Sequence, residues 1–108
     1  MVQQMPVQEL ARKLEAKEPV FLVDVREPWE HEIAALPESK LIPLGQLQVR
    51  VTEIKPPPGA AVIAYCHHGI RSLSAAALLE HLGLTLAYSL AGGIDAWSVA
   101  IDPKVPRY

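Results

Sequence analysis

The chain has 108 residues, of which 50% are hydrophobic and 20% charged, with a net charge of −2 and a single cysteine. This length predicts one domain over residues 1–108, and the apolar content excludes a disordered chain. A slightly acidic chain has no electrostatic drive toward nucleic acid or an anionic membrane, so we expect neither as a partner.

The hydropathy of the chain predicts a cytoplasmic protein without a membrane-spanning helix. Its longest apolar run, from Ala60 to Cys66, is far shorter than the roughly 20 residues that a spanning helix needs. The first residues carry no basic segment followed by an apolar one, so we expect no signal peptide. One cysteine cannot form an internal disulfide, which fits a reducing compartment.

The first half of the chain predicts a helix, a strand and a second helix. Apolar residues from Val7 to Leu14 recur at helical spacing, which predicts a first helix of about ten residues behind Pro6. The continuous apolar run from Val20 to Val23 is typical of a strand covered on both faces. Pro28 can open a short helix, which Pro37 must end.

The second half continues this alternation. Its apolar runs and helical spacings predict, in order, a brief strand at 41–43, a helix over 44–54 despite several β-branched residues, a strand at 61–65, a helix over 72–82, a strand at 86–90 and a terminal turn or helix at 93–97. Alternating strands and helices predict an α/β domain with a mostly parallel sheet.

The segment from Cys66 to Ser72 lies between a predicted buried strand and the start of a helix. A cysteine there faces unpaired helix amides, with Arg71 nearby, and both favour the thiolate. Gly69 lets the backbone curl so that its amides point inward as an anion-binding nest. We therefore interpret Cys66 as a nucleophile, although a free cysteine that ends a strand is also typical of a buried core.

The two histidines of this loop, His67 and His68, allow several interpretations. Adjacent residues on one tight loop cannot surround a metal ion, and the chain lacks ligand spacing elsewhere, so we expect no metal site. Their side chains are either solvated bystanders or a pH-dependent positive rim for an anionic substrate.

Three ordered motifs resemble the rhodanese homology domain over nearly the whole chain. They are the first motif Asp24–Pro28, the active-site loop Cys66–Ser72 and the closing motif Ala91–Trp97. The resemblance implies a three-layer α/β domain with a mostly parallel central sheet flanked by helices. It also implies a sulfurtransferase in which Cys66 takes sulfur as a persulfide and hands it on, without a cofactor.

The resemblance also implies the substrates and the residues that bind them. The donor would be thiosulfate or another small sulfane-sulfur compound, and the acceptor a thiol or cyanide, with a protein persulfide or a sulfur-carrier protein as further partners. Residues 32–38 depart from the family's usual Gly-His-Ile-Pro-Gly stretch and resemble modules attached to sulfur-carrier-activating enzymes. The expected substrate-binding residues are His67, His68, Gly69, Ile70, Arg71, Ser72 and Arg26.

Two residues of the first motif are expected beside the active-site loop. Arg26 either forms an ion pair that holds the strand end to the loop or contacts the donor's anionic group. Asp24 is expected to support the site structurally. Trp29 and Trp97 are interpreted as packing residues.

Two other function classes remain as alternatives. Cysteine phosphatases and arsenate reductases also place a thiolate in an amide cradle, but with five residues between Cys and Arg, whereas Cys66 and Arg71 have four between them. Some rhodanese-like domains act only as binding or regulatory modules, and these have lost the cysteine that this chain retains.

Overall fold

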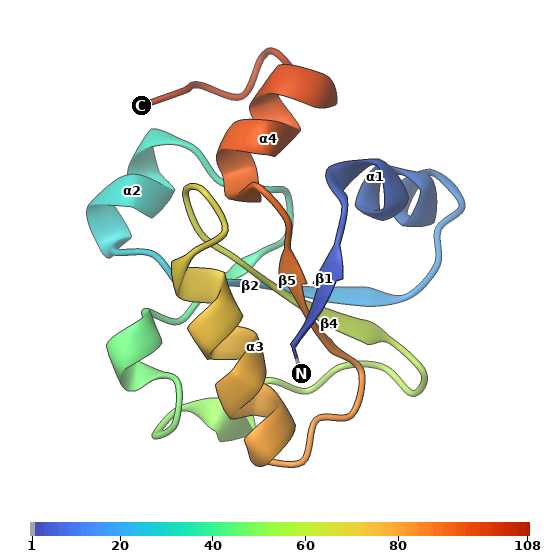
Figure 1. Ribbon diagram of the computed structural model, residues 1–108, viewed down its shortest axis with the longest axis vertical. Coiled ribbons are helices and arrows are strands. Elements are labelled where there is room, and N and C mark those ends of the chain that lie inside the picture. Colours follow the sequence, from blue (N-terminus) through green and yellow to red (C-terminus); the bar gives the residue numbers. More distant parts are fainter. Residues whose placement is uncertain (1) are drawn as a thin grey trace.

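A computed structural model describes residues 2–108, which fold around one five-stranded sheet (Figure 1). Its strands run in the order β1-β5-β4-β2-β3, and every neighbouring pair within these residues is parallel. The strands are β1 (Gln3–Met5), β2 (Val20–Asp24), β3 (Lys40–Leu41), β4 (Ala61–Tyr65) and β5 (Ala87–Leu90). The predicted α/β class is confirmed, and β4 occupies the centre of the sheet.

Residues 2–108 contain four α-helices: α1 (Val7–Glu15), α2 (Pro28–Ile33) and α3 (Arg71–His81) connect strands, and α4 (Gly93–Ala100) follows the last strand. Each predicted helix other than that over 44–54 is present. Pro6 and Pro28 stand at the starts of α1 and α2, where a missing amide hydrogen costs nothing.

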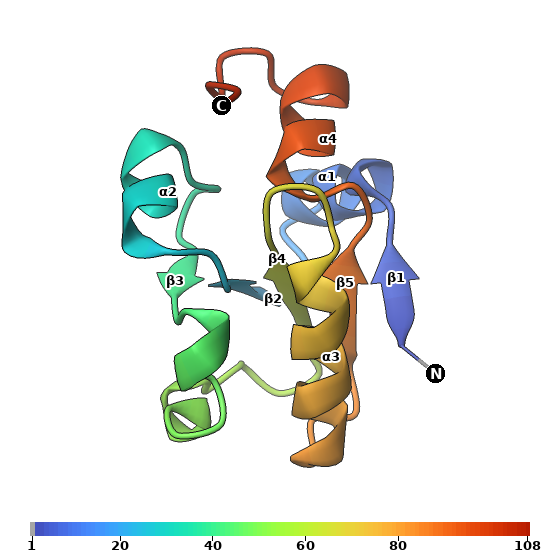
Figure 2. The same cartoon turned by 60° about the vertical axis from the view of Figure 1, so that its left-hand side comes forward.

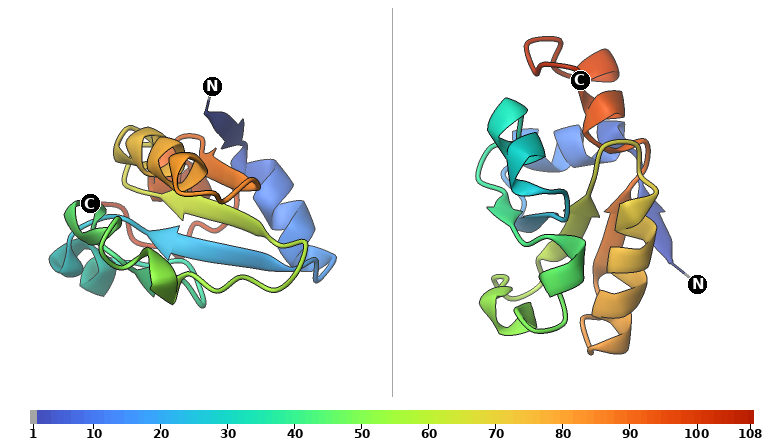
Figure 3. Two further views of the ribbon diagram at one scale, coloured as in Figure 1. Left: turned by 90° about the horizontal axis from the view of Figure 1, so that it is seen from below. Right: turned by 90° about the vertical axis from the view of Figure 1, so that its left-hand side faces the viewer.

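The side chains of β4 alternate between two hydrophobic clusters, one on each face of the sheet. Ala61, Ile63 and Tyr65 join the cluster that α1 and α4 cover. Val62 and Ala64, together with Cys66 just after the strand, join the cluster that α3 covers. Figure 2 shows α1 and α3 on opposite sides of the sheet, and the side view in Figure 3 agrees. The fold is thus three-layered, which explains why its inner strands are apolar without alternation.

The prediction of a helix over 44–54 is wrong. Two short 3-10 turns, Leu44–Gln46 and Val51–Glu53, occupy this segment. Leu47 and Ile54 are nevertheless buried. The apolar spacing therefore reflects burial, while the β-branched residues disfavour a continuous helix.

The sequence patterns did not predict β1, and the two tryptophans pack to different extents. Gln3–Met5 is too short to give a strand pattern, and it forms through parallel pairing with β5. Trp97 is 6% exposed, which confirms packing, whereas Trp29 is 59% exposed and packs only edge-on against the Tyr108 ring, with ring centroids 6.0 Å apart. Across residues 2–108, no helix is long and apolar enough to cross a membrane.

The two leucines of α1 provide a test of this packing. Leu10 is fully buried and Leu14 is 37% exposed. We expect Leu10→Ala to lower the free energy of unfolding by about 2–5 kcal/mol, because it leaves a cavity. Leu14→Ala is the matched control and should cost less than about 1 kcal/mol. Urea denaturation measures both, and equal losses would contradict the described burial.

Candidate active site

Cys66 follows directly after β4, so it lies at the carboxyl end of the central strand. In parallel α/β sheets this edge is where ligands bind. The loop that it begins leads into α3 and lies between α2 and α4 in Figure 1. Cys66 itself is only 1% exposed.

Main-chain amides of the same loop surround the Cys66 sulfur. The N–H groups of Gly69 and Ser72 donate to Sγ over 3.2 and 3.3 Å, and the Ser72 hydroxyl lies 3.5 Å away. Ser89 of β5 holds that hydroxyl through a 2.7 Å hydrogen bond. Gly69 has a φ of +91°, which turns its amide inward. The arrangement is an anion nest centred on one sulfur atom.

The loop is held against the start of α4. The amides of Ile94 and Asp95 donate to the carbonyl oxygens of Cys66 and His67 over 2.9 and 3.1 Å. Gly93 makes this approach possible, because a Cβ added there would overlap the Cys66 oxygen and come within 2.5 Å of the His67 oxygen. Its φ of +62° also suits glycine.

Arg71 begins α3 and forms an ion pair with Glu30 of α2. Its guanidinium donates two hydrogen bonds to the Glu30 carboxylate, of 2.7 and 2.9 Å, and Glu30 is 3% exposed. The Arg71 guanidinium beside Glu30 lowers the pKa of that carboxyl to about 2. The positive charge that we expected to act on the sulfur is therefore balanced by a buried carboxylate.

His67, His68 and Tyr108 form a stack of aromatic rings beside the loop. The ring centroids of His67 lie 3.9 Å from those of both neighbours. Burial, and then the charge of His68, lower the pKa of His67, so its ring is neutral at neutral pH. His67 Nε2 is buried without a hydrogen-bond partner within residues 2–108. His68 is more exposed and lies 3.9 Å from an Asp95 oxygen.

Tyr108 comes from the segment after α4, which runs back toward α2 in Figure 2. Its hydroxyl donates to Glu30 over 2.6 Å and accepts from Arg26 over 2.8 Å. Burial and the hydrogen bond to Glu30 raise the pKa of Tyr108 to about 12, which keeps the phenol protonated. Arg107, the preceding residue, pairs with Asp95 at 2.9 Å.

Asp24 and Arg26 form a fully buried ion pair beneath the site. Two hydrogen bonds of 2.8 and 2.7 Å join the Arg26 guanidinium to the Asp24 carboxylate. Two further N–H groups of the guanidinium donate to the carbonyl of Ala34 and the hydroxyl of Tyr108. Of the two interpretations of Arg26, this contact pattern is that of a structural ion pair.

Ile70 and the expected absence of a metal site complete the comparison with the sequence. Ile70 is 72% exposed, so its side chain does not line the sulfur nest. No group of three His, Cys, Asp or Glu side chains that could hold a metal ion occurs in the part of the chain that the structure describes.

Four residues at the site were not assigned a role from the sequence: Glu30, Ser89, Gly93 and Tyr108. A serine in a buried strand and paired glycines before a helix are local signals that could have identified Ser89 and Gly93. No local signal identifies Glu30 or Tyr108, because their partners are distant in the sequence.

Comparison with known proteins gives a consistent picture. The model of the family described as "Rhodanese-like domain" matches residues 6–100. A protein named "Sulfurtransferase" from Allochromatium vinosum is 35% identical over 98 residues, covering 91% of this chain and 90% of the relative. The "Rhodanese-like/PpiC domain-containing protein 12, chloroplastic" of Arabidopsis thaliana is 39% identical and matches 99% of this chain, but the chain spans only 38% of that relative.

Solved structures share the fold. The crystal structure of a rhodanese-like domain protein from Staphylococcus aureus superposes with a TM-score of 0.82 at 27% identity, and the match covers 99% of both chains.

Replacing Gly93 tests how the loop is supported. In Gly93→Ala the new Cβ would displace the carbonyls of Cys66 and His67, so we expect the rate of Cys66 alkylation by iodoacetamide at pH 7 to change at least about threefold as the nest deforms. Gly59→Ala is the control, because Gly59 also has a positive φ, of +79°, but open space around it. It should cost about 1–2 kcal/mol of stability and leave the alkylation rate unchanged. Equal alkylation rates in both variants would contradict the described support.

Proposed function

This chain belongs to the rhodanese-like domain family, and from that premise we propose that it is a sulfurtransferase that carries sulfane sulfur as a persulfide on Cys66. The observation that supports this most is the nest around the sulfur, in which two main-chain amides donate directly to Sγ. The sulfurtransferase of Allochromatium vinosum, which this chain matches over nearly its whole length, supports the same reaction class.

The reaction has two steps. The Cys66 thiolate attacks the outer sulfur of the donor, the donor's S–S bond breaks, and the leaving group departs with the electron pair. With thiosulfate the leaving group is sulfite. The persulfide then yields its outer sulfur to a nucleophilic acceptor, a thiolate or cyanide, and the electron pair of the broken S–S bond returns to Cys66 as the thiolate.

The protein's contribution is to stabilise negative charge on sulfur at both stages. Preorganised amides of Gly69 and Ser72 need no reorganisation as charge develops. The Ser72 hydroxyl, held by Ser89, can rotate to donate to the thiolate that each cycle regenerates. Because the attacking species is the thiolate, the bond-forming step itself needs no general base.

The dimensions of the loop favour sulfur transfer over phosphate chemistry. In this structure the amides converge on the sulfur itself, at 3.2 and 3.3 Å, which leaves them bound to Sγ rather than free to surround the oxygens of a phosphate. We therefore propose sulfurtransfer rather than phosphatase or arsenate reductase activity.

We also propose the donor, acceptor and compartment. Thiosulfate and persulfides are candidate donors, and low-molecular-weight thiols, cyanide or a sulfur-carrier protein are candidate acceptors. The departure at residues 32–38 from the family's usual stretch supports the carrier protein. A reactive thiol that must stay reduced fits the cytoplasm.

Intact-mass spectrometry tests this function directly. After incubation with thiosulfate, the protein should gain one sulfur atom, which cyanide or dithiothreitol then removes. Because the chain has one cysteine, the adduct reports on Cys66 alone. Cys66→Ser should take up no sulfur and turn over at the uncatalysed rate with its fold intact, because a hydroxyl at neutral pH is not ionised and cannot hold a persulfide.

The same preparation separates the alternatives. Sulfur transfer by Cys66→Ser would refute the role of Cys66. Hydrolysis of an aryl phosphate without any sulfur uptake would favour a phosphatase. Failure to take up sulfur from thiosulfate, a thiosulfonate or a persulfide would indicate a binding module.

A further inference from the structure

The Glu30 carboxylate is held in place from three sides. Both of its oxygens accept from Arg71, and the amide of Glu27 and the hydroxyl of Tyr108 supply a further donor to each, over 3.0 and 2.6 Å. Tyr108 comes from a segment beyond the residues 6–100 that the family model matches. The Arg71 side chain is 38% exposed while that of Glu30 is 4% exposed. In this ion pair the Arg71 guanidinium is the partner exposed to solvent, and the buried Glu30 carboxylate supplies a fixed opposite charge.

Every arginine near the loop has a carboxylate partner, buried for Arg26 and Arg71 and more exposed for Arg107. Arg26 pairs with Asp24, Arg71 with Glu30 and Arg107 with Asp95. His67 is neutral at neutral pH, and His68 lies near the same Asp95. Among residues 2–108, each arginine near Cys66 thus has its charge compensated by a carboxylate.

This charge balance affects donors according to their charge. The Coulomb energy of a donor in the field of the site is proportional to the donor's charge, and a compensated ion pair offers only a small field. Removing a dianion from water costs more than removing a monoanion or a neutral persulfide. A dianionic donor therefore loses hydration at this site without a matching electrostatic gain.

We propose that Glu30, held by Tyr108, determines the donor class of this site by cancelling the charge of Arg71, so that the site favours sulfur donors of low negative charge, such as persulfides, over the thiosulfate dianion. This inference rests on the proposed sulfurtransferase function. It assigns Glu30 a role in specificity rather than in the chemical step.

Glu30→Gln is the most direct test. A glutamine can still accept from the Glu27 amide and from Arg71, but it carries no charge. The donors are thiosulfate, a dianion, and methanethiosulfonate, a monoanion that delivers the same sulfur and releases methanesulfinate. We expect kcat/KM to rise about tenfold for thiosulfate and about threefold for methanethiosulfonate, because the Coulomb energy doubles with the charge. The increase in kcat/KM should come mainly from a lower KM, and it should disappear at about 1 M salt.

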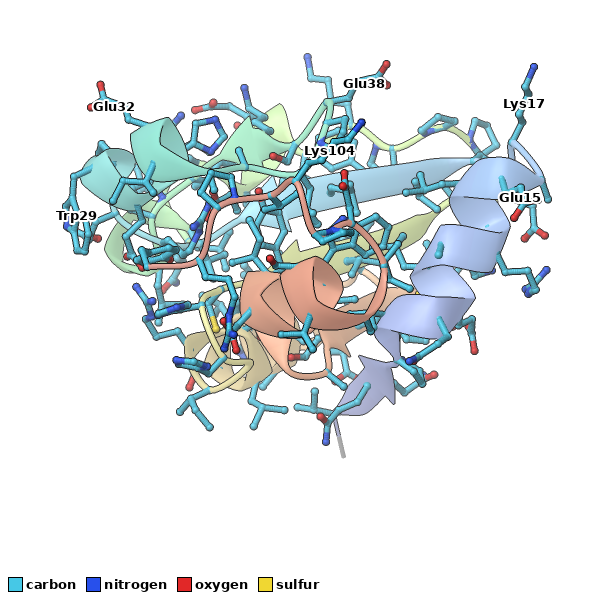
Figure 4. The ribbon with its side chains drawn as sticks, turned by 90° about the horizontal axis from the view of Figure 1, so that it is seen from above. Glu15, Lys17, Trp29, Glu32, Glu38 and Lys104 are labelled. Carbon is cyan, nitrogen blue, oxygen red and sulfur yellow. The ribbon has the colours of Figure 1, made fainter. Side chains whose placement is uncertain are left out.

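Glu32→Gln is the matched control. It removes the same charge from the same helix, α2, but the Glu32 side chain is exposed and points away from the protein in Figure 4. We expect it to change kcat/KM for each donor by less than about twofold.

The ionic-strength dependence of the unchanged protein gives a second test that needs no variant. If the entrance is neutral, KM for thiosulfate should stay within about twofold between low and high salt. A steep rise of KM with salt would overturn the proposal, as would equal changes for the two donors in Glu30→Gln. If the unchanged protein takes no sulfur from thiosulfate, methanethiosulfonate or a persulfide, the sulfurtransferase function itself fails. If it takes sulfur from both anionic donors and Glu30→Gln leaves their ratio unchanged, only the role of Glu30 fails.

Discussion

The buried ion pair of Arg26 and Asp24 is the constraint on which the arrangement of the site depends. Both side chains are fully buried, and a buried charge is tolerated only where its hydrogen-bonding groups are satisfied. Asp24 accepts two hydrogen bonds from the guanidinium, and the Ala34 carbonyl and the Tyr108 hydroxyl accept one each, so that every guanidinium nitrogen has a partner. One guanidinium thus fixes the end of β2, the residue after α2 and the C-terminal segment relative to one another.

Main-chain groups contact the sulfur of the site, whereas charged side chains set the electrostatics around it. The sulfur of Cys66 is held by amides whose positions follow from the course of the loop, so its environment depends on the backbone and on the close approach of Gly93. The charged side chains lie one step further out, where Tyr108 links Arg26 to Glu30 and Glu30 binds Arg71. The geometry around the sulfur and the balance of charge near it therefore depend on different residues.

Much of this architecture could be predicted from local patterns. The strand at 61–65, the loop from Cys66 and the helix behind it follow from an apolar run, a glycine and a stretch of helix-forming residues, and the structure confirms these elements. The helix over 44–54 failed because apolar spacing reports burial and not backbone conformation. Glu30 could not be assigned, because its contacts with Arg71 and Tyr108 span 41 and 78 positions of the sequence and depend on the folded chain.

The central claim is that main-chain amides of the loop hold the Cys66 sulfur. The measurement that tests it most directly is the proton chemical shift of each loop amide by NMR at neutral pH, compared between the unchanged protein and Cys66→Ala. Hydrogen bonds to the sulfur deshield the donated protons, so the Gly69 and Ser72 amides should move upfield in Cys66→Ala by more than any other amide of the loop. If these two amides move no more than that of Gly59, which lies away from the site, the sulfur is not held in this way.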